Sequence, residues 1–180
     1  MQIYLAGPFF NKESKSVLRQ ILNELEELGH EVWAPMRDGI ECPKDADAAM
    51  RRKVFQLDCE QLHWAECVVA LLDYPMPPHQ YLRLHSRTPE GKIDLIDISF
   101  PDSGTVFEIG YTVGLNEAGS DRYRCIIGYT KTSGFNLMVA EACDCIVSDT
   151  AQLQQAMKLV DEGNIEALAF QYATGDLREL

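Results

Sequence analysis

The hydrophobic positions of the chain alternate between short apolar runs and longer stripes with helical spacing. Apolar residues at positions 17, 18, 21, 22, 25 and 28 recur every three or four residues. This spacing predicts a helix that follows Asn11 as its N-cap and is closed by Gly29. The short runs predict five strands, at residues 3–5, 31–34, 67–72, 124–129 and 145–147.

Further helices are predicted between these strands. They span residues from near 45 to about 66, from about 105 to 116, 135–142, and from about 151 to 160. In the first of them, Val54, Leu57 and Leu62 are expected to face the core, and the polar stretch 37–39 before it is expected to be a loop. Strand and helix alternate five times. This order predicts a single three-layer α/β domain, residues 1–180, with a five-stranded, mostly parallel sheet and helices on both faces.

Two segments stand outside this alternation. Residues 74–99 contain Pro75, Pro77 and Pro78, and the alternating stretches YLRLHS and KIDLIDIS flank the turn-like TPEG. We expect a protruding β-hairpin here, which is either a lid or subunit contact or an idle surface decoration. The C-terminal extension after residue 160 is expected to form one or two more helical turns between residues 165 and 172.

The charge balance limits the partners of the chain. It has 16 basic and 28 acidic residues and a net charge of -12, which repels nucleic-acid backbones and acidic membranes and suits a small neutral or cationic ligand. No run approaches the roughly 18 apolar residues of a membrane span. The N-terminal MQIYLAG lacks the basic region of a signal peptide. We therefore expect a cytoplasmic protein that binds neither nucleic acid nor membranes.

The cysteines and histidines form no strong metal motif. Six cysteines lie at positions 42, 59, 67, 125, 143 and 145, without a C-x-x-C pair, and we expect reduced thiols in the core. Cys143 and Cys145 flank Asp144 as alternate residues of a strand do, so a metal site there is the alternative. The four histidines are not spaced as ligands, and we expect neither a metal nor a cofactor.

The predicted sheet brings several candidate residues to one rim. In a parallel sheet, ligands bind beyond the carboxyl ends of the strands, where the strand order reverses. This rule predicts that the following residues lie together at that rim: 7–10, 38, 73, 102–108 and 134–136. Gly7 allows the backbone to come close to a ligand, and Phe9 and Phe10 could stack on a nucleobase. The alternative for this pair of phenylalanines is an ordinary place in the core.

Residues 100–111, FPDSGTVFEIGY, carry the main candidate for chemistry. A turn that contains Asp102 leads into an apolar run with one carboxylate, Glu108, in the first or second turn of a helix. The positive end of the helix favours an ionised carboxylate, and apolar neighbours exclude water, which suits an anionic nucleophile. The alternative is an ordinary helix-start acid that faces solvent. Asp102 and Asp58 offer acceptors or a proton for the edge of a base, although an aspartate in a helix is usually solvated.

Four motifs occur together in an order and spacing that resembles the nucleoside 2-deoxyribosyltransferase family. They are IYLAGPFF at the N-terminus, Asp58 within FQLDCEQLHWAECVVALLD, PDSGTVFEIGYTVG, and GFNLM some 25 residues later. The resemblance covers residues 1 to about 160. It implies a flavodoxin-like sheet and a reaction of nucleoside salvage, in which a 2′-deoxyribosyl group moves from a 2′-deoxynucleoside to a free nucleobase. The implied mechanism is a double displacement that retains the configuration at the sugar.

The resemblance also implies a role for each matching residue. Glu108 matches the nucleophile that attacks C1′ of the sugar and holds it as a glycosyl ester. Asp102 matches the acid that protonates the leaving base, which requires a pKa nearer neutrality than that of a free aspartate. Asp58 matches a residue that hydrogen-bonds the base edge. Tyr4 matches a tyrosine whose hydroxyl steadies the nucleophile, whereas its alternative is a strand tyrosine in the core.

The resemblance extends to a neighbouring subunit. Asn136 in GFNLM matches an asparagine that reaches the sugar hydroxyls of a neighbouring subunit's site, which implies a homo-oligomer, at least a dimer. Asp38 lies where relatives place a polar residue that contacts the base. Two features depart from the family pattern. The chain ends in ATGDLREL instead of a short aromatic tail, which puts a role for Leu180 in doubt, and the insertion at 74–99 is longer than the link in compact members.

Two other functions remain as alternatives. A deoxynucleoside 5′-monophosphate N-glycosidase would use water in place of the second base and needs donors for a phosphate. Phenylalanines stand in the first loop, GPFFNKES, where such donors would be, although Ser103 and Lys12 keep this alternative open. A non-catalytic nucleotide-binding module would be expected to lose its carboxylates, and Asp58, Asp102 and Glu108 are all present.

Overall fold

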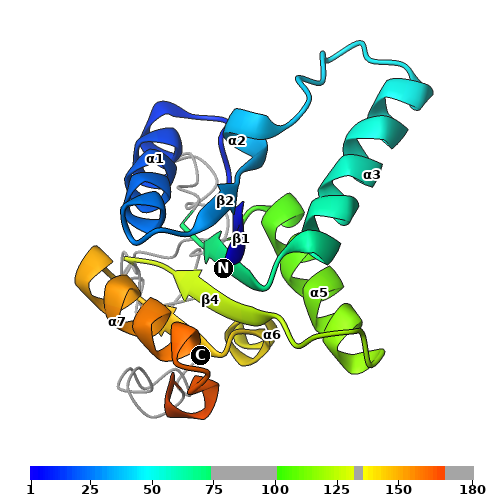
Figure 1. Cartoon of the computed structure of the whole chain (residues 1–180). Coiled ribbons are helices and arrows are strands. Elements are labelled where there is room, and N and C mark those ends of the chain that lie inside the picture. The colour runs from blue at the N-terminus through cyan, green and yellow to red at the C-terminus, as the bar shows by residue number, and fades with distance from the viewer. Residues whose placement is uncertain (74–100, 132–135, 169–180) are drawn as a thin grey trace, which may run out of the picture.

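The computed structural model describes residues 1–73, 101–131 and 136–168 (Figure 1). In this part of the chain, five strands form one sheet in the order β2-β1-β3-β4-β5. The strands are β1 (Gln2–Ala6), β2 (Glu31–Trp33), β3 (Cys67–Leu71), β4 (Cys125–Tyr129) and β5 (Cys145–Val147). The helices are α1 (Lys12–Glu27), α2 (Pro35–Asp38), α3 (Ala48–Trp64), α5 (Ser103–Glu117), α6 (Leu137–Ala142) and α7 (Thr150–Asp161), followed by the 3-10 turn η1 (Ile165–Ala167).

All four strand pairs are parallel. The chain adds β2 on one side of β1 and then continues on the other side with β3, β4 and β5. The strand order therefore reverses between β1 and β3. In a sheet of this kind the reversal opens a crevice at the carboxyl ends of these two strands, which is where a ligand is expected.

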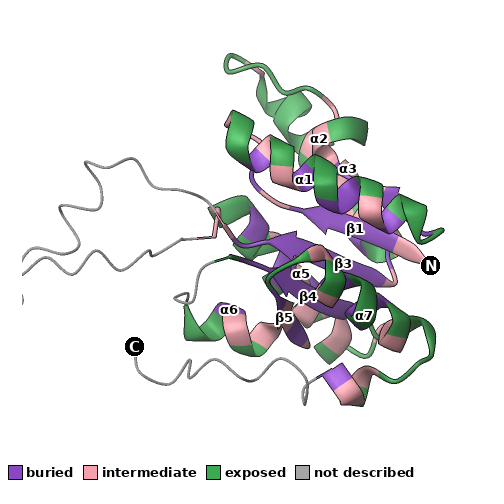
Figure 2. Cartoon of the chain, turned by 90° about the vertical axis from the view of Figure 1, so that its left-hand side faces the viewer, coloured by how far each residue is buried: buried purple, intermediate pink, exposed green. Residues whose placement is uncertain are grey.

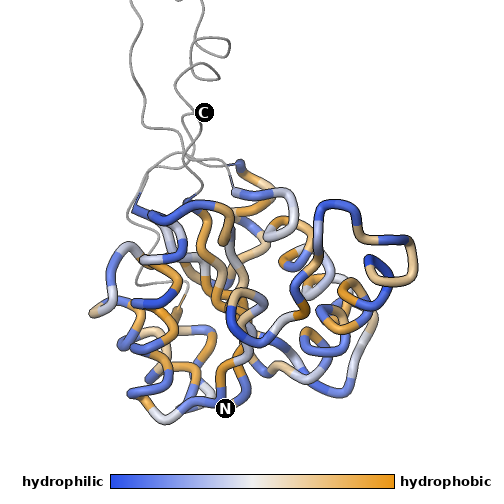
Figure 3. Tube along the Cα trace, turned by 90° about the horizontal axis from the view of Figure 1, so that it is seen from above, coloured by the Kyte–Doolittle hydropathy of each residue, from blue (hydrophilic) through white to orange (hydrophobic). Residues whose placement is uncertain are grey.

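Helices cover both faces of the sheet (Figure 1). The buried residues of α1 and α7 pack on one face, and those of α3, α5 and α6 pack on the other. Side chains alternate along each strand, so that Ile3 and Leu5 of β1 join the first cluster whereas Tyr4 and Ala6 join the second. Tyr4 is thereby presented to α5. Figure 2 shows the buried residues concentrated in the strands, and Figure 3 shows that the hydrophobic residues run along the centre of the molecule.

The predicted five-stranded three-layer architecture is confirmed, and each predicted strand lies within one residue of its observed bounds. The caps explain why several helices begin where they do. The side chains of Asn11 and Asp149 accept hydrogen bonds from the backbone N–H groups of Ser14 and Gln152, each at 2.8 Å. These caps satisfy donors that a helix leaves free in its first turn.

Two local expectations were wrong. Residues 35–38 form the short helix α2 instead of a loop, because Pro35 has a backbone angle suited to a first helical position and the N–H groups of Arg37 and Asp38 bond to the carbonyl of Ala34. The helix expected from near residue 45 begins at Ala48, behind Asp47 as its N-cap.

Helix α3 contributes less to the core than its sequence suggested. Among its residues, all of which the structure describes, only Leu62 is buried, and Val54 and Leu57 are half-buried. Figure 1 shows the reason, because the first half of α3 projects beyond the sheet. The apolar side of this helix is therefore free to line a pocket.

Some expectations concern segments at or beyond the limits of the described residues, and others concern the cysteines and membrane spans. The hairpin predicted at 74–99 and the end of the chain from 169 lie outside the described residues. Residues 165–167 form a 3-10 turn within the predicted 165–172 segment. All six cysteines lie in described segments and are free thiols, but Cys42 is exposed, contrary to the expectation of core thiols. In the described residues, no helix is both long and apolar enough to span a membrane.

Arg124 joins the end of α3 to the start of β4. Its side chain is almost completely buried, and its guanidinium donates to the carbonyl oxygens of Leu62 at 3.1 Å and His63 at 2.8 Å. These carbonyls belong to the last turn of α3, where the helix itself provides no donors. The same side chain also donates to Ser120 Oγ at 2.6 Å. Arg124 thus holds the end of α3 on the sheet.

We expect Arg124→Met to destabilise the fold by about 2–4 kcal/mol, because the variant leaves buried carbonyls without donors. For a domain of this size the melting temperature should fall by roughly 5–12 °C in calorimetry. Arg122→Met is the control, since this guanidinium is exposed and should contribute at most about 1 kcal/mol. An equal loss in both variants would contradict the stabilising role of the contacts to α3.

Candidate active site

The turn before α5 is built by Asp102. This residue is the N-cap of α5, and its Oδ2 atom accepts hydrogen bonds from the N–H groups of Gly104 at 2.9 Å and Thr105 at 3.4 Å. The cap places Glu108 in the second turn of the helix, on the side that faces β1. The buried hydroxyl of Thr112 donates to the Glu108 carbonyl, one turn earlier in the helix, at 2.8 Å.

A hydrogen bond between Tyr4 and Glu108 connects β1 to α5. The Tyr4 hydroxyl donates to Glu108 Oε1 at 2.5 Å. Tyr4 is completely buried, whereas Glu108 is half-buried. The Tyr4 ring also packs against Trp33, with 5.2 Å between ring centroids. Tyr4 is therefore a core residue, as one interpretation predicted, and at the same time a partner of the candidate nucleophile.

The environment of Glu108 favours its protonated form. The pKa of Glu108 is raised to about 8. Burial is the largest cause, the Tyr4 hydroxyl opposes it, and the charges of Asp58 and Asp102 add to it. Burial and the Glu108 charge raise the pKa of Tyr4 as well, so that its hydroxyl stays a donor. The helix start was expected to favour the ionised form of Glu108, and removal from water opposes this effect.

Asp58 approaches the same place from α3. It is half-buried, and burial raises its pKa to about 6. It also raises the pKa values of Glu108 and Tyr4 through its charge. An aspartate that faced bulk solvent would show neither effect, so the alternative of a fully solvated helix charge does not hold for Asp58.

The three carboxylates line one pocket of about 190 Å³ at the carboxyl end of β1. Its lining residues come from the loop after β1, from α2 and the residues after it, from α3 and from the start of α5: Gly7, Phe9, Phe10, Pro35, Gly39, Ile40, Val54, Asp58, Asp102, Gly104, Thr105 and Glu108. We call it the carboxylate pocket. It lies at the reversal of strand order, as the sheet topology predicts.

The loop after β1 forms the aromatic side of the carboxylate pocket. The rings of Phe9 and Phe10 are tilted by 31° with centroids 5.0 Å apart. Phe9 is half-buried against the core, whereas Phe10 is 64% exposed, so the pair is not an ordinary core contact. A Cβ atom on Gly7 would lie 2.7 Å from Leu18 Cδ2 and 3.0 Å from Leu71 Cβ. The loop can therefore pass this close to its neighbours only with glycine at this position.

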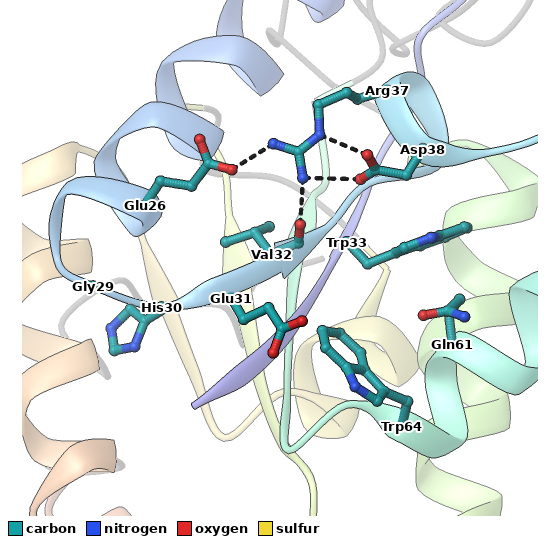
Figure 4. Close-up of a pocket in the computed structure, with 10 residues that line it drawn as sticks. All are labelled: Glu26, Gly29, His30, Glu31, Val32, Trp33, Arg37, Asp38, Gln61 and Trp64. Carbon is teal, nitrogen blue, oxygen red and sulfur yellow. Dashed lines mark hydrogen bonds and ion pairs between the residues drawn. The ribbon is translucent and has the colours of Figure 1, made fainter.

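Two predicted site residues lie elsewhere in the described chain. The Asp38 carboxylate accepts hydrogen bonds from Arg37 Nε at 2.8 Å and from the Ala34 N–H at 2.9 Å, and it lines a different pocket at the edge of the sheet (Figure 4). Burial raises the pKa of Asp38, but these hydrogen bonds and the Arg37 charge lower it overall. Asn136 is exposed and caps α6, where its side chain accepts from the Met138 N–H at 2.8 Å.

Some residues of the carboxylate pocket were missed by sequence reasoning. Val54 was assigned to the core, yet it lies one helical turn before Asp58 on the same side of α3. That spacing was a usable signal. Ile40 and Gly39 carried no local signal, because they reach the pocket only through the path of the chain after α2.

The all-parallel sheet with helices on both faces defines an α/β protein of the flavodoxin-like class. The family model described as nucleoside 2-deoxyribosyltransferase matches residues 3–157. The chain therefore belongs to the nucleoside 2-deoxyribosyltransferase family, as its motifs predicted.

Comparison with solved structures supports the fold. A 2-deoxyribosyltransferase from Bacillus psychrosaccharolyticus aligns with a TM-score of 0.62 and 21% identity, over 86% of this chain and 90% of that one. A conserved protein from Enterococcus faecalis V583 aligns with a TM-score of 0.59 and 17% identity, over 89% and 98%. A 2-desoxiribosyltransferase from Leishmania mexicana aligns with a TM-score of 0.50 and 16% identity, over 87% and 97%. No curated protein matches the sequence.

The raised pKa of Glu108 predicts a pH-dependent cost in stability. The unfolded carboxyl loses its proton near pH 4.5, whereas the folded one holds it up to about pH 8. The contribution of the protonated group is therefore complete below about pH 4.5 and is lost as the pH rises through about 8. Glu108→Gln keeps an acceptor for Tyr4 and removes this loss. We expect the variant to match the parent at pH 4 and to melt roughly 2–6 °C higher at pH 8.

Thermal unfolding of both proteins across this pH range measures the difference. Glu117→Gln, at the exposed end of the same helix, is the matched control and should follow the parent at every pH. A constant difference between Glu108→Gln and the parent from pH 4 to 8 would show that burial does not perturb this carboxyl.

Proposed function

We propose that the chain is a nucleoside 2-deoxyribosyltransferase that moves a 2′-deoxyribosyl group between nucleobases by a retaining double displacement. In the first half, an oxygen of Glu108 bonds to C1′ of a 2′-deoxynucleoside while the bond from C1′ to the base nitrogen breaks. Asp102 gives a proton to the departing base. In the second half, a new base attacks C1′, the ester bond to Glu108 breaks, and the proton returns to Asp102. Such a reaction serves nucleoside salvage in the cytoplasm.

The observation that carries this proposal is the hydrogen bond from Tyr4 to Glu108 at the wall of a pocket with two more carboxylates. Tyr4 occupies one oxygen of Glu108. In the described part of the chain, no other side chain bonds to this carboxylate, which leaves its second oxygen available for C1′. A nucleophile that is oriented in this way divides one difficult displacement into two easier ones.

The proposed proton transfer uses the two oxygens of Asp102 differently. The helix N–H groups of Gly104 and Thr105 both bond to Oδ2, so Oδ1 is left for the base. The acid role requires a proton on this free oxygen. In the proposed reaction Asp102 gives that proton to the departing base and recovers it from the incoming one.

The lining of the carboxylate pocket favours an unphosphorylated nucleoside. In the described residues, no lysine or arginine lines this pocket, and three carboxylates do. A phosphate would be repelled and would find no charged donor. Phe9 and Phe10 offer ring faces on which a base can stack. Asp58, with a pKa of about 6, can accept from or donate to the base edge near neutral pH.

Hydrolysis is the second candidate. It uses the same attack by Glu108, but water instead of a base takes the sugar. Phe10 is largely exposed at the mouth of the carboxylate pocket, so water can reach the glycosyl ester in the protein without ligand. A non-catalytic binding module is disfavoured, because burial raises the pKa values of two neighbouring carboxyl groups, Glu108 and Asp58, and groups perturbed in this way cluster at functional sites.

We also propose that the chain acts as a homo-oligomer, with Asn136 contributing to a neighbouring site. Asn136 begins α6 beside the exposed Leu137 and Met138, and α6 packs along α5. On α3 and α5, the exposed rings of Phe55 and Phe107 stand 5.7 Å apart. Exposed large apolar side chains of this kind are typical of surfaces that a second subunit covers.

The assay that separates the candidates uses thymidine and adenine. A transferase converts them to deoxyadenosine and thymine, a hydrolase releases only free deoxyribose and thymine, and a binding module changes neither compound. Glu108→Ala should fold as the parent does and lose at least about a thousandfold in rate, because a covalent nucleophile accounts for several kcal/mol of the barrier. Glu117→Ala is the control on the same helix. Most of the activity surviving in Glu108→Ala would overturn the mechanism.

A second prediction concerns pH. The Tyr4 hydroxyl lowers the pKa of Glu108, so Tyr4→Phe should raise it and shift the acidic limb of the kcat/KM profile to higher pH, since the nucleophile must be ionised. At pH 7 the rate should fall by about tenfold or more. Tyr123→Phe removes a comparable hydrogen bond, to Asp144 at 2.6 Å, and should leave the profile unchanged. An acidic limb that stays in place in Tyr4→Phe would separate Tyr4 from the ionisation of Glu108.

A further inference from the structure

A second, larger hollow lies at the free edge of the sheet (Figure 4). It has a volume of about 740 Å³ and is bounded by the edge strand β2, the end of α1, α2 and the end of α3. Its aromatic and polar lining includes Glu26, Glu31, Trp33, Arg37, Gln61 and Trp64. We call it the edge pocket. It contains none of the three carboxylates proposed for catalysis, so its chemistry has to be considered separately.

Arg37 is the arginine that lines the edge pocket, and its guanidinium is already bonded to neighbouring groups of the protein. Arg37 donates from Nε to Asp38 Oδ1 at 2.8 Å and from Nη2 to Asp38 Oδ2 at 2.9 Å, and it also bonds to Glu26 and to the carbonyl of Val32 (Figure 4). The bond to Val32 satisfies a carbonyl on the open edge of β2, which would otherwise invite another strand. An anionic ligand would have to displace these bonds. The edge pocket is therefore poorly suited to a phosphate or a carboxylate.

The acceptors of the edge pocket, in contrast, are unused. Glu31 is exposed, and within the described residues its carboxylate makes no hydrogen bond or ion pair. The side-chain amide of Gln61 likewise has no partner there, and Arg37 takes only one oxygen of Glu26. The free polar groups of the pocket are thus mainly acceptors with negative charge. A ligand that fits them donates hydrogen bonds and carries a positive charge.

Both tryptophans of the chain line the edge pocket. Each is half-buried, so part of each ring is exposed to the hollow. Trp33 is held in place because its ring packs against Tyr4, with 5.2 Å between centroids. The face of an indole is the best aromatic surface for a cation. Figure 4 shows the Glu31 carboxylate and the Trp64 ring projecting from neighbouring walls of the pocket.

We propose that the edge pocket binds an organic ammonium ion. The ammonium group donates to the Glu31 carboxylate and the Gln61 amide oxygen, and the apolar body of the ligand contacts the rings of Trp33 and Trp64. The net charge of -12 favours the approach of such a cation. The proposal does not depend on the reaction at Glu108, because it rests on the donors, acceptors and rings of a different pocket.

The two tryptophans make the test direct. Since the chain has only these two, fluorescence excited beyond the absorption of tyrosine reports on Trp33 and Trp64, which both line the edge pocket. Titration of the full chain with 2-phenylethylammonium at constant ionic strength should give a saturable change, with a Kd on the order of 0.1–1 mM, as expected for one partly exposed cation contact. The neutral 2-phenylethanol should bind at least about fivefold more weakly, and the anionic phenylacetate should give no saturable signal.

Two variants test the site assigned to the ammonium group. Glu31→Gln keeps the size of the side chain and should weaken binding by about fivefold. Glu60→Gln is the matched control, because this acid is exposed on α3 next to Gln61 but does not line the pocket, and its affinity should equal that of the parent. The proposal would be overturned if the amine and the alcohol bound with equal affinity. It would also be overturned if Glu31→Gln and Glu60→Gln bound the amine with equal affinity.

Discussion

The site depends on one hydrogen bond, between a completely buried tyrosine and a carboxyl group that burial has largely removed from water. The hydroxyl oxygen of Tyr4 and the carboxyl oxygen of Glu108 are 2.5 Å apart, and this hydrogen bond opposes the rise in the pKa of Glu108 that burial causes. The bond requires the correct register of β1, since neighbouring side chains point to opposite faces of the sheet. A shift by one residue would direct Ile3 or Leu5 at α5, and the carboxyl group would have no donor.

The second constraint is the start of α5. A helix N-terminus stabilises a charged cap, and Asp102 fills this role with one oxygen atom. The same residue lines the carboxylate pocket with Asp58 and Glu108. One side chain therefore has both a structural place and a proposed chemical one. The two oxygens of a carboxylate are compatible with both, because Oδ2 binds the helix and Oδ1 is left for a ligand.

The carboxylate pocket and the edge pocket share two walls. Pro35 and Gly39 at the ends of α2 line the carboxylate pocket, whereas Arg37 and Asp38 line the edge pocket. Helix α3 turns Asp58 toward one pocket and its last turn toward the other. Between them, the ring of Trp33 contacts that of Tyr4. A ligand in the edge pocket would lie one side chain away from the partner of Glu108, so the two pockets are neighbours.

Much of the architecture could be predicted from the sequence, because strands, helices and caps depend on neighbours close in the chain. The apolar runs and the spacing after Asn11 are local signals of this kind. Residue identities and the motifs around Glu108 were enough to indicate the family. The pKa of Glu108 could not be predicted in the same way, since it depends on burial and on Asp58, a residue of another helix.

Partners far apart in sequence were decided only by the tertiary structure. Tyr4 and Glu108 lie 104 residues apart, and the parallel sheet brings them together because β1 lies next to β3 and α5 packs on β3. Asp38 was expected at the base and instead binds Arg37, whose other partner, Glu26, comes from α1. The sequence by itself determined which elements form and which residues can do chemistry. The packing of these elements determined which carboxyl groups lose water, and this loss sets their charge.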